Sequence, residues 1–255
     1  MEYVGVGTVT GLYGVSGIEN AVLVDSPRAF DNIKKGIERV TGERQGCTGI
    51  RSIVGRQSGV GLVLVQVPPY PQAVVDAVSE LYIFGIRRVI GLGRAFSLTK
   101  RLPSRPVLMA KAAVPLDAVS TIVADEGLPL APSSKMEYTF KTIVELRFTD
   151  FNWIYGYTVT TPSPYIRSLT ESVRKLAGKR GVIAIDSMSS ALYALQYEYS
   201  KLETLSLLSF AGSFEQIASS SVVRSVDDMT AIMEKIGREE TILYMIAVEI
   251  FKKLG

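Results

Sequence analysis

The chain has 255 residues, of which 21% are charged, and its formal net charge is +3. This positive excess is too small to indicate a nucleic-acid partner, and the short basic cluster at residues 100–105 contains a proline and favours a solvated loop. Histidine is absent, which excludes Ser-His-Asp and Cys-His catalysis and the usual imidazole zinc sites.

The compartment is indicated by the cysteine count and by the start of the chain. One cysteine, Cys47, excludes an internal disulfide bond and fits a reducing environment. The start of the chain has no basic segment followed by an apolar run, and no run reaches the roughly 18 apolar residues of a membrane helix. We therefore expect a cytoplasmic protein with no membrane partner and no metal.

Strand-like and helix-like runs alternate along the chain without a flexible linker, which predicts one domain over residues 1–255. The predicted strands are Ala21–Asp25, Ile50–Gly55, Leu62–Val67, Arg88–Leu92, Pro106–Val114, Tyr155–Thr161, Val182–Asp186 and Leu205–Phe210. The predicted helices are Pro27–Val40, Pro71–Phe84, Lys135–Leu146, Pro164–Leu176, Ser189–Tyr199 and Val226–Lys253. Strand–helix–strand units at residues 61–92 and 182–210 predict an α/β fold with a mixed or parallel sheet and helices on both faces.

The last predicted helix has apolar residues at helical spacing, including Ile236, Ile242, Met245 and Ile246. We expect this apolar side to cover one face of the sheet.

One candidate ligand position is the string GLGRA at residues 91–95, which follows a predicted strand. The backbone at Gly93 and the guanidinium of Arg94 could approach an anion there. The alternative is a glycine turn with an exposed arginine, because the full G-x-G-x-x-G fingerprint is absent.

Polar residues follow two other predicted strands, at the edge where open α/β sheets bind ligands. Asp186, Ser187 and Met188 end one strand, and Ser209 and Phe210 end another. Asp186 is a candidate catalytic acid, and its alternative role is to cap the helix that follows.

A third candidate position is the string TTPSPY at residues 160–165. The hydroxyls of Thr160 and Thr161 and the ring of Tyr165 could contact a ligand, and the hydroxyls could equally cap a helix.

The order of elements and three strings, SELYIFGIRRVIGLGRAFSL, YTVTTPSPY and VIAIDSMSSALYAL…LSLLSF, resemble the nucleoside phosphorylase family, which includes purine nucleoside and uridine phosphorylases. The resemblance extends from about Ala21 to the C-terminal helix. It implies a single α/β domain around a mixed, partly barrel-like sheet flanked by helices on both faces. It also implies a homo-oligomer, either a dimer or a hexamer of dimers. The implied ligand is a nucleoside or base, with phosphate as a possible co-substrate and no other cofactor.

The phosphate motifs of that family are only partly kept. Its G-D-P-x-R string corresponds to VDSPR at residues 24–28, so the resemblance implies that Arg28 binds an anion. Its R-x-G-T/S-x-G string corresponds to residues 91–96, where the arginine and the hydroxyl are lost and Gly93 remains. Arg94 stands in the place of the hydroxyl and either replaces the lost charge or fills the anion pocket.

The ribose motif departs further from the family. A Met-Glu pair, whose carboxylate accepts hydrogen bonds from ribose, falls on Ser187-Met188 or, one residue later, on Met188-Ser189. Neither register supplies the glutamate, which leaves Asp186 as the nearest acid.

The base motifs also change. The Ser-Asp pair of the family falls on Ser209-Phe210, and phenylalanine cannot move a proton. The T-T-D-x-F-Y string keeps Thr160, Thr161 and Tyr165.

These losses leave three hypotheses open. A general acid contributes about 10²- to 10⁴-fold to a rate, and one preorganised electrostatic donor contributes about 10²- to 10³-fold. We therefore favour a nucleoside-phosphorylase-like protein that binds a nucleoside, a base or a similar small ligand, with phosphorolysis weak, altered or absent. The alternatives are an active purine nucleoside or uridine phosphorylase and a non-catalytic structural subunit.

Overall fold

In a computed structural model of the protein, residues 7–255 are described except 14, 16, 39, 41, 47–48, 100–101, 104–105, 124–127, 163–166 and 215–225. At residues 167–170, 179–180 and 226–238 only the backbone is described. Cys47 and Tyr165 therefore lie outside the described residues.

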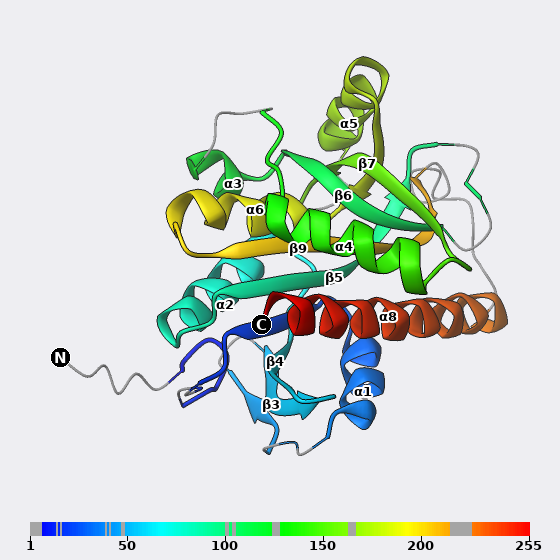
Figure 1. Cartoon of the computed structure of the whole chain (residues 1–255). Helices are drawn as coiled ribbons and strands as arrows, with labels where there is room; N and C mark the ends of the chain where they lie inside the picture. The colour runs from blue at the N-terminus through cyan, green and yellow to red at the C-terminus, as the bar shows by residue number, and fades with distance from the viewer. Residues whose placement is uncertain are drawn as a thin grey trace.

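Strands and helices alternate as the sequence predicts (Figure 1). The strands are β1 (Asn20–Val24), β2 (Arg44–Gln45), β3 (Arg51–Gln57), β4 (Val60–Gln66), β5 (Arg88–Ser97), β6 (Pro106–Pro115), β7 (Asn152–Thr160), β8 (Val182–Asp186) and β9 (Glu203–Ser213). The helices are α1 (Pro27–Gly36), α2 (Pro71–Ile83), α3 (Ala118–Val123), α4 (Ser134–Arg147), α5 (Arg167–Arg180), α6 (Ser189–Glu198) and α8 (Val226–Leu254).

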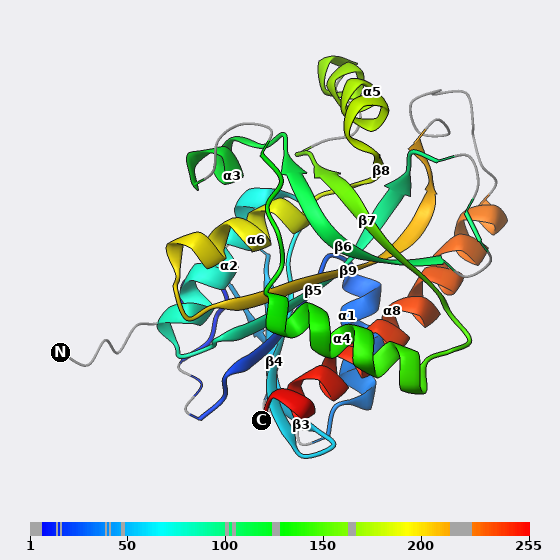
Figure 2. The ribbon, with the colours of Figure 1, turned by 45° about the horizontal axis from the view of Figure 1, so that its top comes forward.

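The described strands form one mixed sheet that closes on itself over part of its width. Their order is β2-β3-β4-β1-β5-β8-β7-β6-β9, and β9 pairs in addition with β5. This last pairing closes β5, β8, β7, β6 and β9 into a barrel, seen in the upper half of Figure 2. Strands β1 and β4 extend the sheet from β5 in parallel register, and β3 joins β4 antiparallel. The predicted mixed, partly barrel-like sheet is confirmed.

Helices cover both faces of this sheet. Helices α1, α4 and α8 pack on one face, around a core that includes Phe30, Phe140 and Phe251. Helices α2 and α6 pack on the other face, around Leu81, Leu192 and their neighbours. Figures 1 and 2 show α4 and α8 side by side along the first of these faces. None of the described helices is both long enough and apolar enough to cross a membrane.

Local signals set several of these boundaries. The Ser26 hydroxyl accepts the Ala29 N–H at 3.3 Å and caps α1, with Pro27 in its first turn. Helix α2 ends before Gly85, whose φ of +100° is a conformation that glycine adopts without strain.

Several details of the prediction are wrong. Helix α1 ends at Gly36 instead of Val40, and β2 and α3 are not predicted at all. Strand β5 continues to Ser97 instead of ending at Leu92, so Gly91 and Gly93 lie inside a strand and do not form a turn. Met245 is 54% exposed, although its spacing predicts the covered side of α8.

Candidate functional site

Several of the predicted site residues meet around the second half of β5. Strand β8 runs antiparallel to β5 and pairs Ile185 with Phe96, while β9 runs parallel to β5 and pairs Phe210 with Ala95. Strand β1 reaches the same place, because the N–H of Asp25, just after β1, donates to the Leu92 carbonyl at 3.4 Å. The ends of β1 and β8 and the middle of β9 thus surround residues 92–96.

Arg94 is held by Asp25. The backbone N–H of Arg94 donates to Asp25 Oδ2 at 3.0 Å, and Nε of the same residue donates to Asp25 Oδ1 at 3.3 Å. The Asp25 side chain is 3% exposed and the Arg94 side chain 26%. Burial raises the pKa of Asp25, and the charge and hydrogen bonds of Arg94 oppose that rise.

A second buried acid, Glu240 of α8, lies near this pair. Its side chain is 1% exposed, and its Oε1 atom has no hydrogen-bond partner among the described residues. Burial raises the pKa of Glu240 to about 8, and the nearby charges of Asp25 and Glu239 add to the rise while Arg94 opposes it. Glu240 is therefore mostly neutral at pH 7.

Asp186 binds the amides at the start of α6. Its Oδ1 atom accepts the N–H groups of Met188 at 2.8 Å and Ser189 at 2.7 Å, and the Thr160 hydroxyl at 3.1 Å. The Thr160 hydroxyl oxygen accepts the next amide, that of Ser190, at 2.9 Å. These are the helix-capping contacts that the sequence offers as the alternative for Asp186, and they also explain Thr160.

The other carboxylate oxygen of Asp186 does not share these hydrogen bonds. Oδ2 is buried without a hydrogen-bond partner among the described residues. The buried Thr158 hydroxyl lies near enough to lower the pKa of Asp186, but outside hydrogen-bond geometry. Desolvation is the larger effect, and it raises the pKa of this carboxyl.

Met188 and Phe210 belong to the apolar core. Met188 is 1% exposed and Phe210 is 7% exposed, and both pack in the same cluster as Ala95. A Cβ atom added at Gly91 would lie 2.8 Å from the sulfur of Met188, and one at Gly93 would lie 3.2 Å from it. The two glycines of β5 therefore make room for a methionine side chain.

The remaining predicted residues are scattered around this centre. Arg28 is exposed on the first turn of α1. Thr161 is buried, and its N–H donates to the Asp186 carbonyl at 3.0 Å, while Ser187 is half-buried. The buried hydroxyl of Ser209 lies 3.5 Å from the Gly93 carbonyl, at the limit of a hydrogen bond.

Comparison with known proteins gives a structural answer. No protein-family model matches the sequence, and no curated protein matches it. Uridine phosphorylase from Vibrio fischeri, solved with 6-hydroxy-1-naphthoic acid, superimposes with a TM-score of 0.77 at 17% identity, over 93% of both chains. Another structure of that enzyme gives 0.76 at 16% identity, also over 93% of both chains. Purine nucleoside phosphorylase from Toxoplasma gondii, solved with immucillin-H, gives 0.76 at 17% identity, over 93% of this chain and 91% of that one.

The chain has the nucleoside phosphorylase fold. The resemblance seen in the sequence is confirmed at the level of the fold, and identities of 16–17% carry no information on substrate.

Within this nucleoside phosphorylase-like chain, sequence reasoning missed a buried polar cluster behind α6. The Ser190 hydroxyl donates to Asp117 Oδ2 at 2.8 Å and lies 2.9 Å from the Ser120 hydroxyl. Asp117 Oδ1 accepts the Ser120 N–H at 2.7 Å, which caps α3. No periodic pattern in the sequence predicts these contacts, because Asp117 and Ser190 are 73 residues apart.

Sequence reasoning also passed over Asp25 and Glu240. Asp25 lies inside the string that drew attention to Arg28. Glu240 falls four residues after Ile236 and three before Leu243, so a charged residue interrupts the apolar spacing of the last helix. This interruption is the sequence signal by which Glu240 could have been identified.

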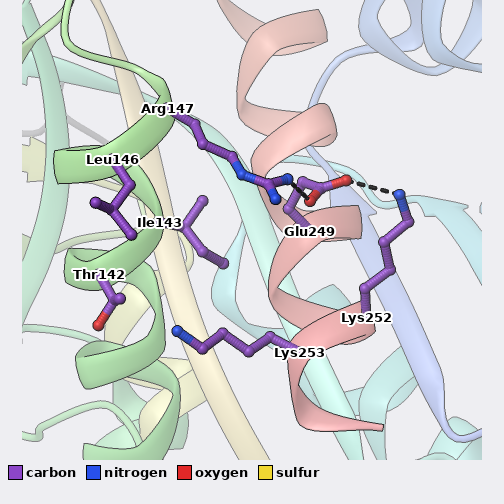
Figure 3. A pocket seen from close by; sticks show the side chains of 7 residues that line it. All are labelled: Thr142, Ile143, Leu146, Arg147, Glu249, Lys252 and Lys253. Carbon is purple, nitrogen blue, oxygen red and sulfur yellow. Dashed lines mark hydrogen bonds and ion pairs between the residues drawn. The ribbon is translucent and has the colours of Figure 1, made fainter.

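Two hollows formed by described residues lie away from this centre. One, of about 490 Å³, lies between α4 and α8 (Figure 3). Its Glu249 pairs with Arg147 and, at 2.7 Å, with Lys252. The other, of about 510 Å³, lies where β1 and β5 begin, beside Asn20 and Arg88. Neither contains a predicted site residue.

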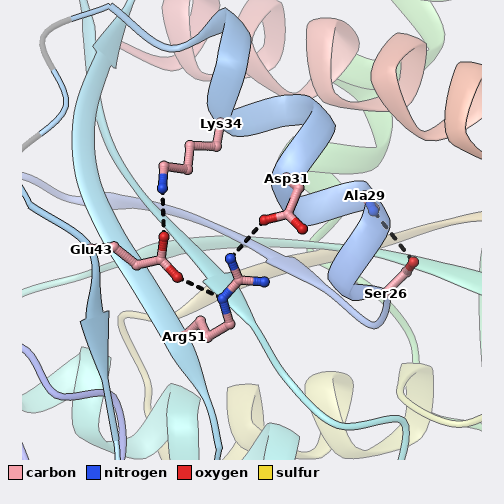
Figure 4. A network of polar contacts seen from close by, with 6 residues as sticks. All are labelled: Ser26, Ala29, Asp31, Lys34, Glu43 and Arg51. Atoms are coloured by element: carbon pink, nitrogen blue, oxygen red, sulfur yellow. Dashed lines mark hydrogen bonds and ion pairs between the residues drawn. The ribbon is translucent and has the colours of Figure 1, made fainter.

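A surface network fixes α1, which carries Arg28. Arg51 of β3 pairs with Asp31 and with Glu43, both at 2.6 Å, and Lys34 pairs with Glu43 at 2.5 Å (Figure 4). Hydrogen bonds from Arg51 and Lys34 lower the pKa of Glu43. Exposed pairs contribute little each, so the network orients α1 more than it stabilises the protein.

Proposed function

We propose that the protein is a nucleoside-phosphorylase-like protein that binds a nucleoside, a nucleobase or a similar small ligand, and whose phosphorolysis is weak, altered or absent. The fold supports the ligand class, since the structural neighbours are a uridine phosphorylase and a purine nucleoside phosphorylase. In the described part of the chain, no group of three or more cysteine or acidic residues could hold a metal ion.

The packing of Met188 and Phe210 is the observation that supports weak, altered or absent phosphorolysis. In one register the resemblance places Met188 where the family has its ribose-binding glutamate, and in the other register it places Ser189 there. It places Phe210 where the family has its base-contacting aspartate. Met188 and Phe210 are apolar and nearly fully buried in the core cluster that also contains Ala95. Neither can accept a hydrogen bond from ribose or transfer a proton to a leaving base.

Asp186 does not compensate for this loss. Its Oδ1 atom already accepts three hydrogen bonds from α6 and Thr160. A carboxylate engaged in this way has one free oxygen, Oδ2, and that atom is buried. Asp186 therefore supports the start of α6, and its use as a catalytic acid would require the helix start to rearrange.

The proposed setting of the protein rests on the sequence and on the resemblance. We propose a cytoplasmic homo-oligomer, a dimer or a hexamer of dimers, with a small-molecule partner and neither nucleic acid nor membrane as a partner. Phosphate is the one co-substrate that an active form would use.

A non-catalytic structural subunit is the second candidate. It is favoured by the way internal contacts use the polar groups at the site: Asp25 binds Arg94, and Asp186 and Thr160 bind three consecutive amides of α6. An active phosphorylase, the third candidate, would need Arg28 and Arg94 for phosphate and Asp186 or Ser187 for ribose.

The deciding experiment is a phosphate-dependent assay on the purified protein with inosine, adenosine, guanosine and uridine. Free base and ribose 1-phosphate are measured beside an active uridine phosphorylase, and thermal shifts are recorded with the same nucleosides and their bases. We expect a thermal shift with at least one ligand and turnover at least about 10³-fold below the active enzyme, because an acid and an electrostatic donor are lost.

The variants Arg94→Ala and Arg28→Ala are compared with Lys35→Ala, which removes an exposed cation from the same helix as Arg28. Base release that needs phosphate and falls in the two site variants alone would establish an active enzyme. Absence of both turnover and thermal shift would favour the structural subunit.

A further inference from the structure

The hollow between α4 and α8 has exposed apolar surface on its α4 side. Its volume of about 490 Å³ is in the range of small-molecule sites (Figure 3). The side chain of Ile143 extends from α4 toward α8, and Leu146, about one turn further along α4, is 74% exposed. Leu146 therefore offers apolar surface to a ligand between the two helices, and covering it would be favourable in proportion to the area removed from water.

Positive charge is in excess around the same hollow. The described residues that line it include three cations, Arg147, Lys252 and Lys253, and one acid, Glu249. The acid is shared, because its Oε2 atom pairs with Arg147 and its Oε1 atom pairs with Lys252 at 2.7 Å. One carboxylate balances only one of three cations, so two positive charges remain and the hollow is complementary to an anion.

Lys253 is the cation of this group that no internal acid neutralises. Its ammonium group makes neither an ion pair nor a hydrogen bond within the described part of the chain. The helix dipole favours a cation in the last turn of α8, which explains a lysine at this position. The dipole does not require the direction of the side chain, which in Figure 3 extends across the hollow toward α4. The ammonium group thus lies on the side of the apolar surface of α4.

We propose that the hollow lined by Ile143, Leu146, Arg147, Glu249, Lys252 and Lys253, here called the α4–α8 groove, binds a small organic anion. The anionic group of this ligand pairs with Lys253, and its apolar part covers Leu146 and Ile143. The groove contains none of the residues around β5, so this second site goes beyond the proposed function and does not depend on it. Inorganic phosphate alone should bind weakly, because the groove is open to solvent, which screens its charges.

The test is a calorimetric titration with 1-naphthyl phosphate at pH 7 and constant ionic strength. Inorganic phosphate and uncharged 1-naphthol are titrated separately, as the two halves of this probe. We expect 1-naphthyl phosphate to bind at least about tenfold more tightly than either half, because it uses the charge and the apolar surface together. Equal affinities for 1-naphthyl phosphate and 1-naphthol would overturn the proposal.

Two variants with opposite effects assign the binding to the groove. Lys253→Gln should weaken the binding of 1-naphthyl phosphate about fivefold, and Glu249→Gln should strengthen it by a similar factor, because it removes the opposing charge. Damage to the fold would not produce a gain. Lys35→Gln is the control, since Lys35 is an exposed lysine in the last turn of another helix, α1. If Lys253→Gln has no larger effect than Lys35→Gln, the probe binds elsewhere and the proposal is wrong.

The apolar part of the site is tested by Leu146→Ala. We expect this variant to bind 1-naphthyl phosphate about threefold more weakly or worse. Ile83→Ala, which shortens a 70% exposed side chain at the end of α2, is its control and should keep the affinity of the wild type. Equal affinities of Leu146→Ala and Ile83→Ala would overturn the apolar contact.

Nucleoside thermal shifts are recorded for the wild type and for Lys253→Gln. Equal shifts in the two proteins are expected if the groove is a separate site, and a shift lost only in Lys253→Gln would overturn that separation. Absence of nucleoside shifts from the wild type would count against the proposed function, whereas the affinities for 1-naphthyl phosphate test the groove alone.

Discussion

At the scale of single residues, substitutions of Asp186 can separate its role as a helix cap from a role in catalysis. We expect Asp186→Ala to lower the free energy of unfolding by about 2 kcal/mol or more, because it removes a cap and leaves buried amides without an acceptor. Asp186→Asn should cost less, since its amide oxygen can still accept the N–H groups of Met188 and Ser189. Urea unfolding of the three proteins measures both effects.

Ser187→Ala is the control, because Ser187 is the half-buried neighbour at the same strand end. A stability of Asp186→Ala equal to that of Ser187→Ala would show that the cap is dispensable. If Asp186→Asn kept its stability and lost a phosphorolytic activity present in the wild type, Asp186 would be a catalytic residue instead.

Only some of the contacts made by single residues at the site can be predicted from the sequence. The short separation between Asp186 and the start of α6 allowed its capping role to be weighed in advance. The pairing of Asp25 with Arg94 spans 69 residues, and only the parallel register of β1 and β5 brings the two together. Sequence patterns report local spacing, so Arg94 could be flagged but its partner could not.

At the scale of elements, the contact between β5 and α6 is a packing of glycine against methionine. Gly91→Ala would bring its Cβ atom to 2.8 Å from the sulfur of Met188 and 3.0 Å from Cδ2 of Leu192. We expect the substitution to cost about 1–3 kcal/mol, as overpacked cores do. Met188→Ala should cost about 2–5 kcal/mol through the cavity it leaves.

The double variant Gly91→Ala/Met188→Ala tests whether the two changes share one space. We expect it to be less destabilised than the sum of the single variants, with a coupling of about 1 kcal/mol measured by chemical unfolding. Gly178→Ala is the control, because a Cβ atom there meets nothing within 4 Å. Additive effects of Gly91→Ala and Met188→Ala would mean that the methionine can move away freely.

Most elements could be predicted because each has its own periodicity. Strand β8 matches its predicted bounds, α6 ends one residue earlier than predicted, and Pro27 and Pro71 mark two helix starts correctly. Helix α3 and β2 have only 6 and 2 residues, too few for a period to appear. The second half of β5 was missed because glycine inside a strand usually signals a break, and here it admits Met188.

At the scale of the whole molecule, barrel closure depends on β9 pairing with both β5 and β6. Such non-local pairing has no local signal, and only the resemblance to a known family predicted it. Helix α8 packs against strands of both the barrel and the open sheet, and it brings Glu240 close enough to Asp25, just after β1, and to Arg94 of β5 for their charges to act on it. The stability of the whole fold should therefore depend on the protonation of this one residue.

The direction of that dependence follows from the raised pKa. Glu240 has a pKa of about 8 in the folded protein, against an ordinary value of 4.5, so between these pH values the folded state keeps a proton that the unfolded state releases. Stability contributed by this group therefore falls as pH rises from about 4.5 to about 8 and is constant above. The total penalty is at most about 5 kcal/mol.

Glu240→Gln should remove this penalty. We expect the variant to match the wild type near pH 5 and to be more stable than it by a margin that increases up to about pH 8, in urea unfolding measured at each pH. Glu145→Gln, an exposed glutamate on α4, should show no such growing margin. A constant difference between Glu240→Gln and the wild type across this range would mean that Glu240 titrates normally, and that α8 lets water reach the charges at the ends of β1 and β5.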